Sequence, residues 1–300
     1  MNDENNIYTS QGISINNLTS NPNLKLIEEQ GSFKVFEHQQ DCSCLPIESQ
    51  IGYYMQKMGI RRRQLLITLN NSTAKTQAGA MQWIAGNIES HTGLGSGAQA
   101  VGKFLSGLVK GALTGESSVK PHYEGSGFVM LEPTYKHILL EDVSTWEAGM
   151  VVQDSLYLAS DATVEEKVVA RKSISSMIAG GEGFFNLSLR GKGIVALECP
   201  VPRSEIIEFT LNNGILKIDG NMAIAWSSNL DFTVEKSSKS IIGSLTNKEG
   251  LVNVYKGTGK IWLTPTVEGT LMQEGNIQNN TSNGGKATKG ILDALSSNDN

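Results

Sequence analysis

Three glutamates recur at nearly constant spacing, and they are the polar side chains best suited to a shared site. Glu116, Glu182 and Glu249 stand at almost equal intervals along the chain. Carboxylates brought together by a repeat could jointly hold a cation or a ligand. Each carboxylate could instead accept backbone N–H bonds and fix the loop before a strand, because polar side chains often stabilise turns. We favour this structural role and keep the binding site as the alternative.

The other reactive side chains do not match a catalytic or metal-binding pattern. His38, Cys42 and Cys44 could begin a zinc site, but no fourth ligand follows at a matching spacing. Residues 97–104 nearly match a phosphate-binding loop, yet Phe104 stands where that motif needs Ser or Thr. No Gly-x-Ser-x-Gly motif occurs, and no histidine has a visible nucleophile and orienting partner. We therefore expect no catalytic residue, no metal, no cofactor and no enzymatic activity.

Arg61, Arg62 and Arg63 form the one dense basic run. Such a run could contact phosphate or an acidic partner, but strand-like sequence follows it directly. We therefore interpret it as a charged, solvated strand edge. The whole chain carries 25 Lys and Arg against 30 Asp and Glu, with a formal net charge of −5. Binding to nucleic acid requires a basic face, so this balance argues against a nucleic-acid partner.

The ends of the sequence and its cysteines bear on localisation. Residues 1–25 and 271–300 are rich in Asn, Ser, Thr and Gly, and we expect both to be disordered tails. The N-terminal residues lack the regions of a signal peptide, and no stretch approaches the ~18 apolar residues of a membrane span. Cys42, Cys44 and Cys199 are an odd number of cysteines, which suits a reducing compartment. These features predict a cytoplasmic protein.

The elements that must position these side chains follow an internal repeat. A Gly-x-Gly pair followed by apolar residues begins at Gly125, at Gly191 and at Gly257, so the two intervals are equal. Regular recurrence of this kind is typical of a fold built from repeated units. Glycines at alternate positions of a strand indicate bulges or close backbone approach.

A second pattern extends the repeat towards the N-terminus. Ala225 follows Ala159 at the same interval, and the matching alanine of the first copy is Ala85, so the first unit is about eight residues longer. Short β-like runs separated by Gly, Asn and Asp fill each unit. We predict a single domain at 26–270 with three repeats. They span about 26–124, 125–190 and 191–256, and a closing strand follows at 257–265.

The predicted fold class is mainly all-β. Three units with one strand left over suggest closure, in which the last strand completes a sheet begun by the first. Closure around a pseudo-threefold axis would also remove exposed strand edges.

One segment in each unit has helical rather than strand-like periodicity. In residues 98–113 the apolar residues recur at the spacing of one helical face, and 172–178 and 239–245 are shorter equivalents. We expect short helices that cover an open face of the β body. Docking of segment 98–113 on a membrane or a partner is the alternative, although an interfacial helix usually has a more basic polar face.

These motifs resemble a known family. The repeated Gly-x-Gly strands, the Gly-Glu pairs before them and the run Ala80-Met81-Gln82-Trp83 are similar to a family first described as a domain of unknown function. It was later named for the mitochondrial protein called altered inheritance of mitochondria, number twenty-four. The resemblance covers about residues 26–265 and is greatest to the bacterial branch, which has a longer segment, here residues 53–58.

The resemblance implies a TRAP-like shortened double-stranded β-helix with three repeats, often assembled as a homotrimer, and no established catalytic activity. Mitochondrial relatives are linked to inner-membrane organisation, but we expect no mitochondrial presequence here and do not carry that role over. We therefore expect a non-enzymatic, self-associating β scaffold or binding module. Its expected partner is itself, together with an unknown protein or membrane surface. The alternatives are a small-molecule-binding or enzymatic β-barrel with a site between repeats or subunits, and a peripheral membrane-associated organiser.

Overall fold

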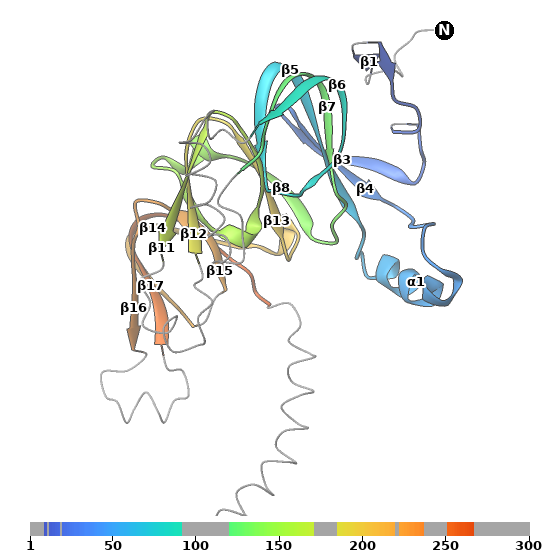
Figure 1. Cartoon of the computed structure of the whole chain (residues 1–300). Helices are drawn as coiled ribbons and strands as arrows, with labels where there is room; N and C mark the ends of the chain where they lie inside the picture. Colours follow the sequence, from blue (N-terminus) through green and yellow to red (C-terminus); the bar gives the residue numbers. More distant parts are fainter. Residues whose placement is uncertain are drawn as a thin grey trace, which may run out of the picture.

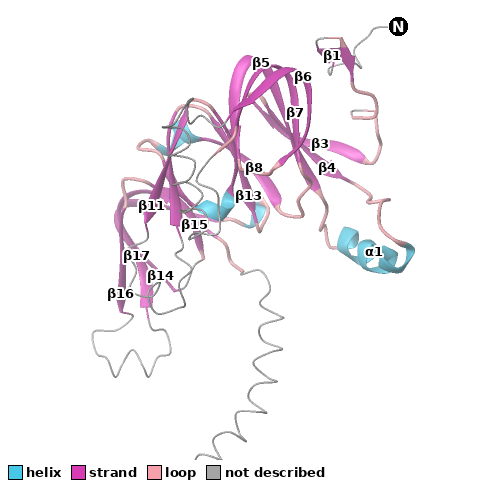
Figure 2. Ribbon diagram, in the orientation of Figure 1, coloured by secondary structure: helices cyan, strands magenta, loops and turns pink. Residues whose placement is uncertain are grey.

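Strands make up most of the molecule, and its helical segments are short (Figures 1 and 2). The computed structural model describes residues 9–10, 12–18, 20–91, 120–170, 185–219, 222–236 and 251–266. All strand pairs in the two large sheets are antiparallel. The predicted all-β class with short helical segments is confirmed.

The first sheet has eight strands. They are β3 (Leu24–Gln30), β4 (Phe33–His38), β5 (Arg63–Thr76), β6 (Met81–His91), β7 (His122–Leu131), β8 (His137–Asp142), β10 (Tyr157–Asp161) and β13 (Ile194–Cys199). The order is β3–β4–β5–β10–β13–β8, and β7 pairs with both β5 and β6. Strand β5 is the centre of the sheet, because β7 occupies one of its edges while β4 and β10 share the other.

The second sheet has seven strands. They are β9 (Met150–Gln153), β11 (Val164–Ala170), β12 (Phe185–Gly191), β14 (Ile207–Asp219), β15 (Ala223–Ser227), β16 (Asp231–Lys236) and β17 (Leu251–Leu263). The order is β11–β12–β9–β15–β17–β14, and β16 also pairs with β17. The expected closing strand lies in β17 and does not complete a sheet begun by the first strands. Both edges of β17 are already occupied, one by β14 and the other by β15 and β16.

The two sheets share one core. Strand β13 is apolar on both faces: Val195 and Leu197 pack between the sheets, whereas Ile194 and Ala196 pack inside the first sheet. The core between the sheets also holds two tryptophans, whose rings meet edge to face with centroids 5.1 Å apart. Burial of such large aromatic side chains is a strong source of stability, so it ties the two sheets into one body.

The remaining elements are short. They are β1 (Thr9–Ser10), β2 (Ile13–Ser14), α1 (Ser49–Lys57) and the 3-10 turns η1 (Pro46–Glu48), η2 (Val143–Trp146), η3 (Asp154–Leu156) and η4 (Arg203–Glu205). Helix α1 buries none of its own residues.

The N-terminal segment is not wholly the disordered tail that we expected. Leu18 is 6% exposed and packs beside β4, β5 and β7, against Phe36, Leu66 and Phe128. An apolar side chain that fills a gap in the core orders the chain around it. The parts of the tail predictions at 1–8 and 271–300 lie outside the described residues.

The repeated glycines have the close backbone approach that the sequence suggested. Gly125 and Gly127 have φ of 139° and 147°, and an added Cβ at either would overlap a carbonyl oxygen of β6. The glycines of the other two motifs also have positive φ. The first motif therefore excludes a side chain for steric reasons, and all three favour glycine.

Strand registers correct one detail of the repeat alignment. The residue five positions after the first glycine of each motif pairs with Trp83, Ala159 or Ala225. By strand register, Trp83 rather than Ala85 therefore takes the position of the two alanines, and its interval to Ala159 is two residues longer than the interval from Ala85 that the sequence alignment used. Because side chains alternate with a period of two along a strand, a two-residue slip keeps the same face and is invisible in the sequence pattern.

Candidate functional site

The glutamates of the predicted site, Glu116, Glu182 and Glu249, all lie outside the described residues, as do the predicted helical segments 98–113, 172–178 and 239–245. In the part of the chain that the structure describes, no group of three or more His, Cys, Asp or Glu residues could hold a metal ion. Across the same ranges, no helix has the length and apolar character needed to cross a bilayer.

A pocket of about 280 Å³ lies beside α1. It is enclosed by the segment that follows β4, by α1, by the residues just before β5 and by the loop between β7 and β8. Charged and polar side chains meet apolar ones in its lining, which consists of His38, Asp41, Cys44, Glu48, Ile51, Gly52, Met55, Gln56, Ile60, Arg61, Arg62 and Tyr135.

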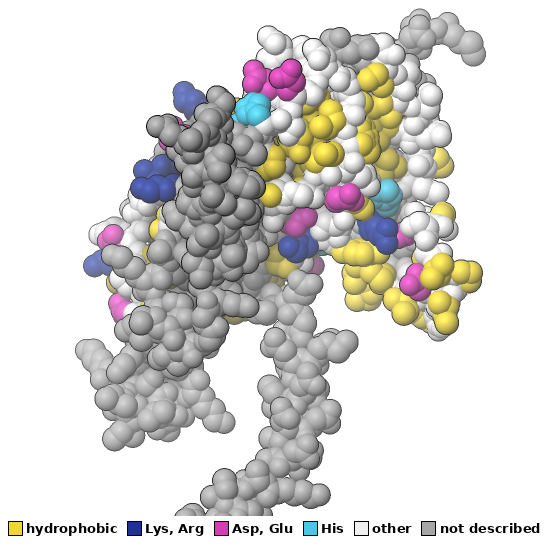
Figure 3. Space-filling view, in the orientation of Figure 1, with side chains coloured by type: hydrophobic (Ala, Val, Ile, Leu, Met, Phe, Trp, Pro, Cys, Tyr) yellow, Lys and Arg dark blue, Asp and Glu magenta, His cyan; other side chains and the backbone are white. Residues whose placement is uncertain are grey.

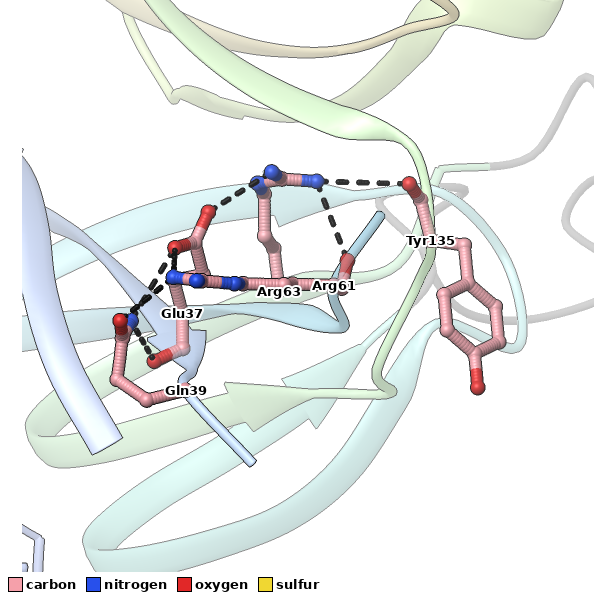
Figure 4. Close-up of polar contacts among 5 residues, drawn as sticks. All are labelled: Glu37, Gln39, Arg61, Arg63 and Tyr135. Atoms are coloured by element: carbon pink, nitrogen blue, oxygen red, sulfur yellow. Dashed lines mark hydrogen bonds and ion pairs between the residues drawn. The ribbon is translucent and has the colours of Figure 1, made fainter. Parts of the chain in front are cut away.

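Glu37 binds two arginines, Arg61 in the lining of the pocket and Arg63 at the start of β5 (Figure 4). Its carboxylate is 3.1 Å from Arg61 Nη1 and 2.8 Å from Arg63 Nη2. Arg61 Nη1 also donates to Gln39 Oε1 at 2.6 Å. Strand pairing explains this arrangement, because Glu37 in β4 lies directly opposite Arg63 in β5. Opposite charges at such cross-strand positions stabilise the pairing.

Arg63 is only 4% exposed. Its guanidinium donates to the backbone carbonyls of Arg61 and Tyr135, at 3.1 and 3.5 Å. Burial acts to raise the pKa of Glu37, but hydrogen bonds from Gln39 and the arginines lower that pKa below its usual value. The interpretation of the arginine run as a solvated strand edge is therefore wrong for Arg63, because β4 covers this edge and supplies the counter-charge.

Arg62 faces the pocket and is also paired. Its Nε donates to the hydroxyl of Tyr135 at 2.9 Å, and its guanidinium lies 3.1 Å from Asp41 Oδ2. The same guanidinium stands 5.2 Å from the centroid of the Tyr135 ring. The hydrogen bond to Tyr135, with Asp41 nearby, raises the pKa of Arg62. Its positive charge is thus already compensated within the chain.

Two histidines, His38 and His137, also lie near the arginines. A ring nitrogen of His38 is 2.8 Å from Gln64 Oε1, an amide oxygen. Burial, together with Arg63, lowers the pKa of His137 to about 4, so this imidazole is neutral at pH 7. The mixture of charged and apolar side chains in its lining makes the pocket suited to binding an amphipathic group.

The cysteines are free thiols. Cys44 lines the pocket and is partly exposed, and Cys42 is exposed. Cys199 is buried in the core, and its burial raises the pKa of its thiol to about 11. A raised pKa makes a thiol unreactive, so Cys199 is a packing residue.

An apolar surface lies next to the pocket, and sequence reasoning did not identify it. We call it the α1 surface; Figure 3 shows its yellow side chains gathered over the helix. It consists of Leu45, Ile47, Ile51, Tyr53, Tyr54, Met58 and Ile60, which are between 44% and 87% exposed. The helical spacing of Ile47, Ile51, Tyr54 and Met58 was the available signal. That signal predicts a helix, but it does not reveal that the apolar face points to solvent.

Comparisons with known proteins agree with the fold. A family model described as "Mitochondrial biogenesis AIM24" matches residues 55–266. An uncharacterised protein of Streptococcus pyogenes serotype M6 is 25% identical over 190 residues, which cover 62% of this chain and 74% of that protein. A crystal structure of a Streptococcus pyogenes protein has a TM-score of 0.51 and 21% identity, and the match covers 74% of this chain and 94% of that one.

Proposed function

This chain belongs to the AIM24 family, and from that starting point we propose that it is a non-enzymatic β scaffold that binds other protein chains, including copies of itself. The exposed α1 surface is the observation that carries the proposal. Proteins that remain monomeric rarely expose contiguous apolar patches of this kind, and larger patches mark interaction sites. The compensated arginines beside it favour an amphipathic protein surface over a free anion as the partner.

The finer features of the proposal come from the sequence. We propose three internal repeats in a TRAP-like arrangement and a homotrimer as the assembly. Two free cysteines with exposed surface, Cys42 and Cys44, favour a reducing compartment such as the cytoplasm. The net charge of −5 and the pairing of Arg61, Arg62 and Arg63 with carboxylates argue against nucleic acid as a partner.

Size-exclusion chromatography with light scattering tests the association. The full chain is expected to form oligomers at micromolar concentration. The triple variant Ile47→Ser/Ile51→Ser/Met58→Ser changes only exposed side chains. If these side chains are buried on binding, the variant should raise the dissociation midpoint, the protein concentration at which half of the oligomer has dissociated, at least about tenfold. Val168→Ser/Val169→Ser, at exposed apolar positions on β11 away from the α1 surface, is the control. A strictly monomeric wild-type mass would refute self-association.

A small-molecule site in the pocket is the second candidate, because the pocket combines paired charges with an apolar wall. Calorimetry with a ligand library against wild type and Arg62→Ala would test it. Binding that Arg62→Ala abolishes would favour this candidate over the scaffold. The membrane-organiser alternative rests on residues 98–113, and failure of the full chain to sediment with anionic liposomes would remove it.

A further inference from the structure

Several strands of the two large sheets pair along one edge only among the described residues, and β6 and β14 are two of them. Strand β6 pairs only with β7, and β14 pairs only with β17. The two open edges lie in opposite parts of the molecule, β6 beside β5 and β7 and β14 beside β16 and β17 (Figure 1). Open strand edges are templates for pairing with another chain.

Two other contacts show how such edges meet inside the chain. In the first, β5 pairs with β10, and Thr76 lies opposite Ala159. In the second, β9 pairs with β15, and Val152 lies opposite Ala225. Each contact is antiparallel and three residue pairs long. We call these contacts the first and second junctions.

The first strand of each junction is marked by its backbone. Asn71 and Glu147 have φ of 49° and 50°, and Thr76 and Val152 each follow after five residues. The second strand of each junction is marked by its pairing. Ala159 and Ala225 each pair with the residue five positions after the first glycine of a Gly-x-Gly motif. The two junctions are therefore in the same register.

The two strands that a third junction would need, β14 and β6, are also present in the chain, but they do not pair with each other. In β14, Asn213 has φ of 50°, and Ile218 follows it after five residues. In β6, Trp83 pairs with Met130, the residue five positions after Gly125. Ile218 thus corresponds to Thr76 and Val152, and Trp83 corresponds to Ala159 and Ala225.

We propose that β14 of one copy pairs antiparallel with β6 of a second copy and so forms this third junction. Ile218 then lies opposite Trp83 of the second copy. Lys217 lies opposite its Ile84, and Leu216 lies opposite its Ala85. This inference rests on the self-association proposed above and adds to it a contact that is separate from the α1 surface.

The side chain of Lys217 supports this register. Its counterpart in the first junction, Lys75, is 5% exposed, donates to the backbone carbonyl of Val164 and lies 2.8 Å from Glu166 Oε2. Ile88 corresponds to Val164, because each pairs with the first glycine of its motif. Lys217 can therefore donate to the Ile88 carbonyl of the second copy.

Forming this contact breaks only a weak interaction. Within one copy Lys217 makes an ion pair of 3.1 Å with Glu235, and the two side chains are 56% and 49% exposed. Exposed pairs of this kind contribute little to stability. The contact is also head to tail, because the two edges differ, so it generates a closed ring or a growing chain of copies.

Disulfide cross-linking tests the contact. Ile84→Cys and Lys217→Cys are made as two separate proteins, each in a Cys42→Ser/Cys44→Ser background. The two proteins are then mixed, so that each is the binding partner offered to the other. Residues directly opposite have Cβ atoms about 5 Å apart, within reach of a disulfide after small shifts. A cross-linked dimer should form in the mixture and not in either protein alone. Ile84→Cys mixed with Ile215→Cys, displaced by two residues, is the control and should cross-link at least about fivefold less.

A second measurement does not depend on cysteine geometry. Lys217→Glu should raise the dissociation midpoint at least about tenfold, whereas Lys217→Arg should leave it within about twofold. Oligomers that show neither the matched cross-link nor this sensitivity would overturn the junction while leaving self-association intact. A wild-type chain that is monomeric throughout would overturn both. A cross-link in either single protein would indicate a symmetric contact and also refute the proposed pairing.

Discussion

Strands β5 and β14 have matching backbones in different surroundings. Each pairs along its length with a strand that carries a Gly-x-Gly motif, and each is interrupted by a bulge at an Asn-Asn pair. Asn71 and Asn213 have φ of 49° and 50° at these bulges. Their N–H groups donate to hydroxyls at the same place in the facing motif, Ser126 Oγ at 2.9 Å and Thr258 Oγ1 at 3.0 Å.

The two strands differ in what covers their second edge. Strands β4 and β10 cover β5, whose Leu65, Leu66 and Ile67 are fully buried. Strand β14 has no such neighbour among the described residues, and its Ile215 is 59% exposed. The same backbone pattern is therefore buried in β5, where the chain supplies further strands, and exposed in β14, where it does not. The predictions below test that difference.

The largest effect is expected from removing the buried lysine of β5. Lys75→Met leaves the carboxylate of Glu166 buried beside Tyr157 and Ser160 without its cation, which should cost about 4 kcal/mol of unfolding free energy. Lys217→Met removes only an exposed pair from β14 and should cost less than about 0.5 kcal/mol. Urea unfolding at concentrations below association measures both. Equal losses would mean that the two strands do not differ in burial as described.

The next effect compares the glycines that face the two strands. In Gly125→Ala the new methyl would overlap the carbonyl oxygen of Asn87, whereas in Gly257→Ala it would meet Leu230 Cδ2 at 3.5 Å, an ordinary contact. Both have positive φ. We expect a loss of about 3 kcal/mol for the first variant and about 1 kcal/mol for the second. Thermal unfolding followed by circular dichroism measures this ranking, and the reverse order would contradict it.

A smaller effect should come from the strained position between β8 and β9. Glu147 precedes Asn213 by the same number of residues that separates Gly125 from Gly191, and it shares the positive φ of Asn213. Its ψ is −78°, however, a conformation that glycine adopts more easily. Glu147→Gly should therefore stabilise the chain by about 1.5 kcal/mol. Glu205→Gly, at an exposed residue of the short turn η4, is the control and should not stabilise. A lower melting temperature for Glu147→Gly would refute the strain.

The smallest effect concerns the covered start of β5, where His137 lies near Arg63 and Glu37. Its pKa is about 4 in the folded chain against an ordinary 6.5. The unfolded chain therefore takes up a proton first as the pH falls, so stability is lost between about pH 6.5 and 4. Allowing for partial exposure, the loss at pH 5 should be about 1 kcal/mol. His137→Gln should flatten the change in unfolding free energy between pH 7 and pH 5, and an unchanged slope would contradict the assignment.

The sequence predicted the parts of the fold that depend on local pattern. The alternating apolar runs predicted an all-β chain, and the Gly-x-Gly pairs predicted close backbone approach, because only glycine fits at positive φ beside a carbonyl. The family assignment was also readable from the same motifs. The three structural repeats remain a prediction, as do the pseudo-threefold axis and the roles of Glu116, Glu182 and Glu249.

Other expectations failed because they depended on which strand lies beside which. Arg63 was predicted to lie on a solvated strand edge, but β4 covers that edge and places Glu37 opposite it. Strand β17 looked like a closing strand, but its edges are used within the second sheet. The α1 surface was also missed, since helical spacing does not reveal whether a partner covers the apolar face.

By itself, the sequence determined the secondary structure class, the close backbone approach at the Gly-x-Gly pairs and the family, because these depend on residue types within a few positions of each other. Only the tertiary structure decided which arginines are buried, where the pocket lies and which strand edges are left open. Those properties depend on pairing between strands that are far apart in the sequence. The apolar pattern of a strand does not specify which strand pairs with it, because any strand in the chain can supply the hydrogen bonds. For β6 and β14 we infer that this neighbour comes from another copy.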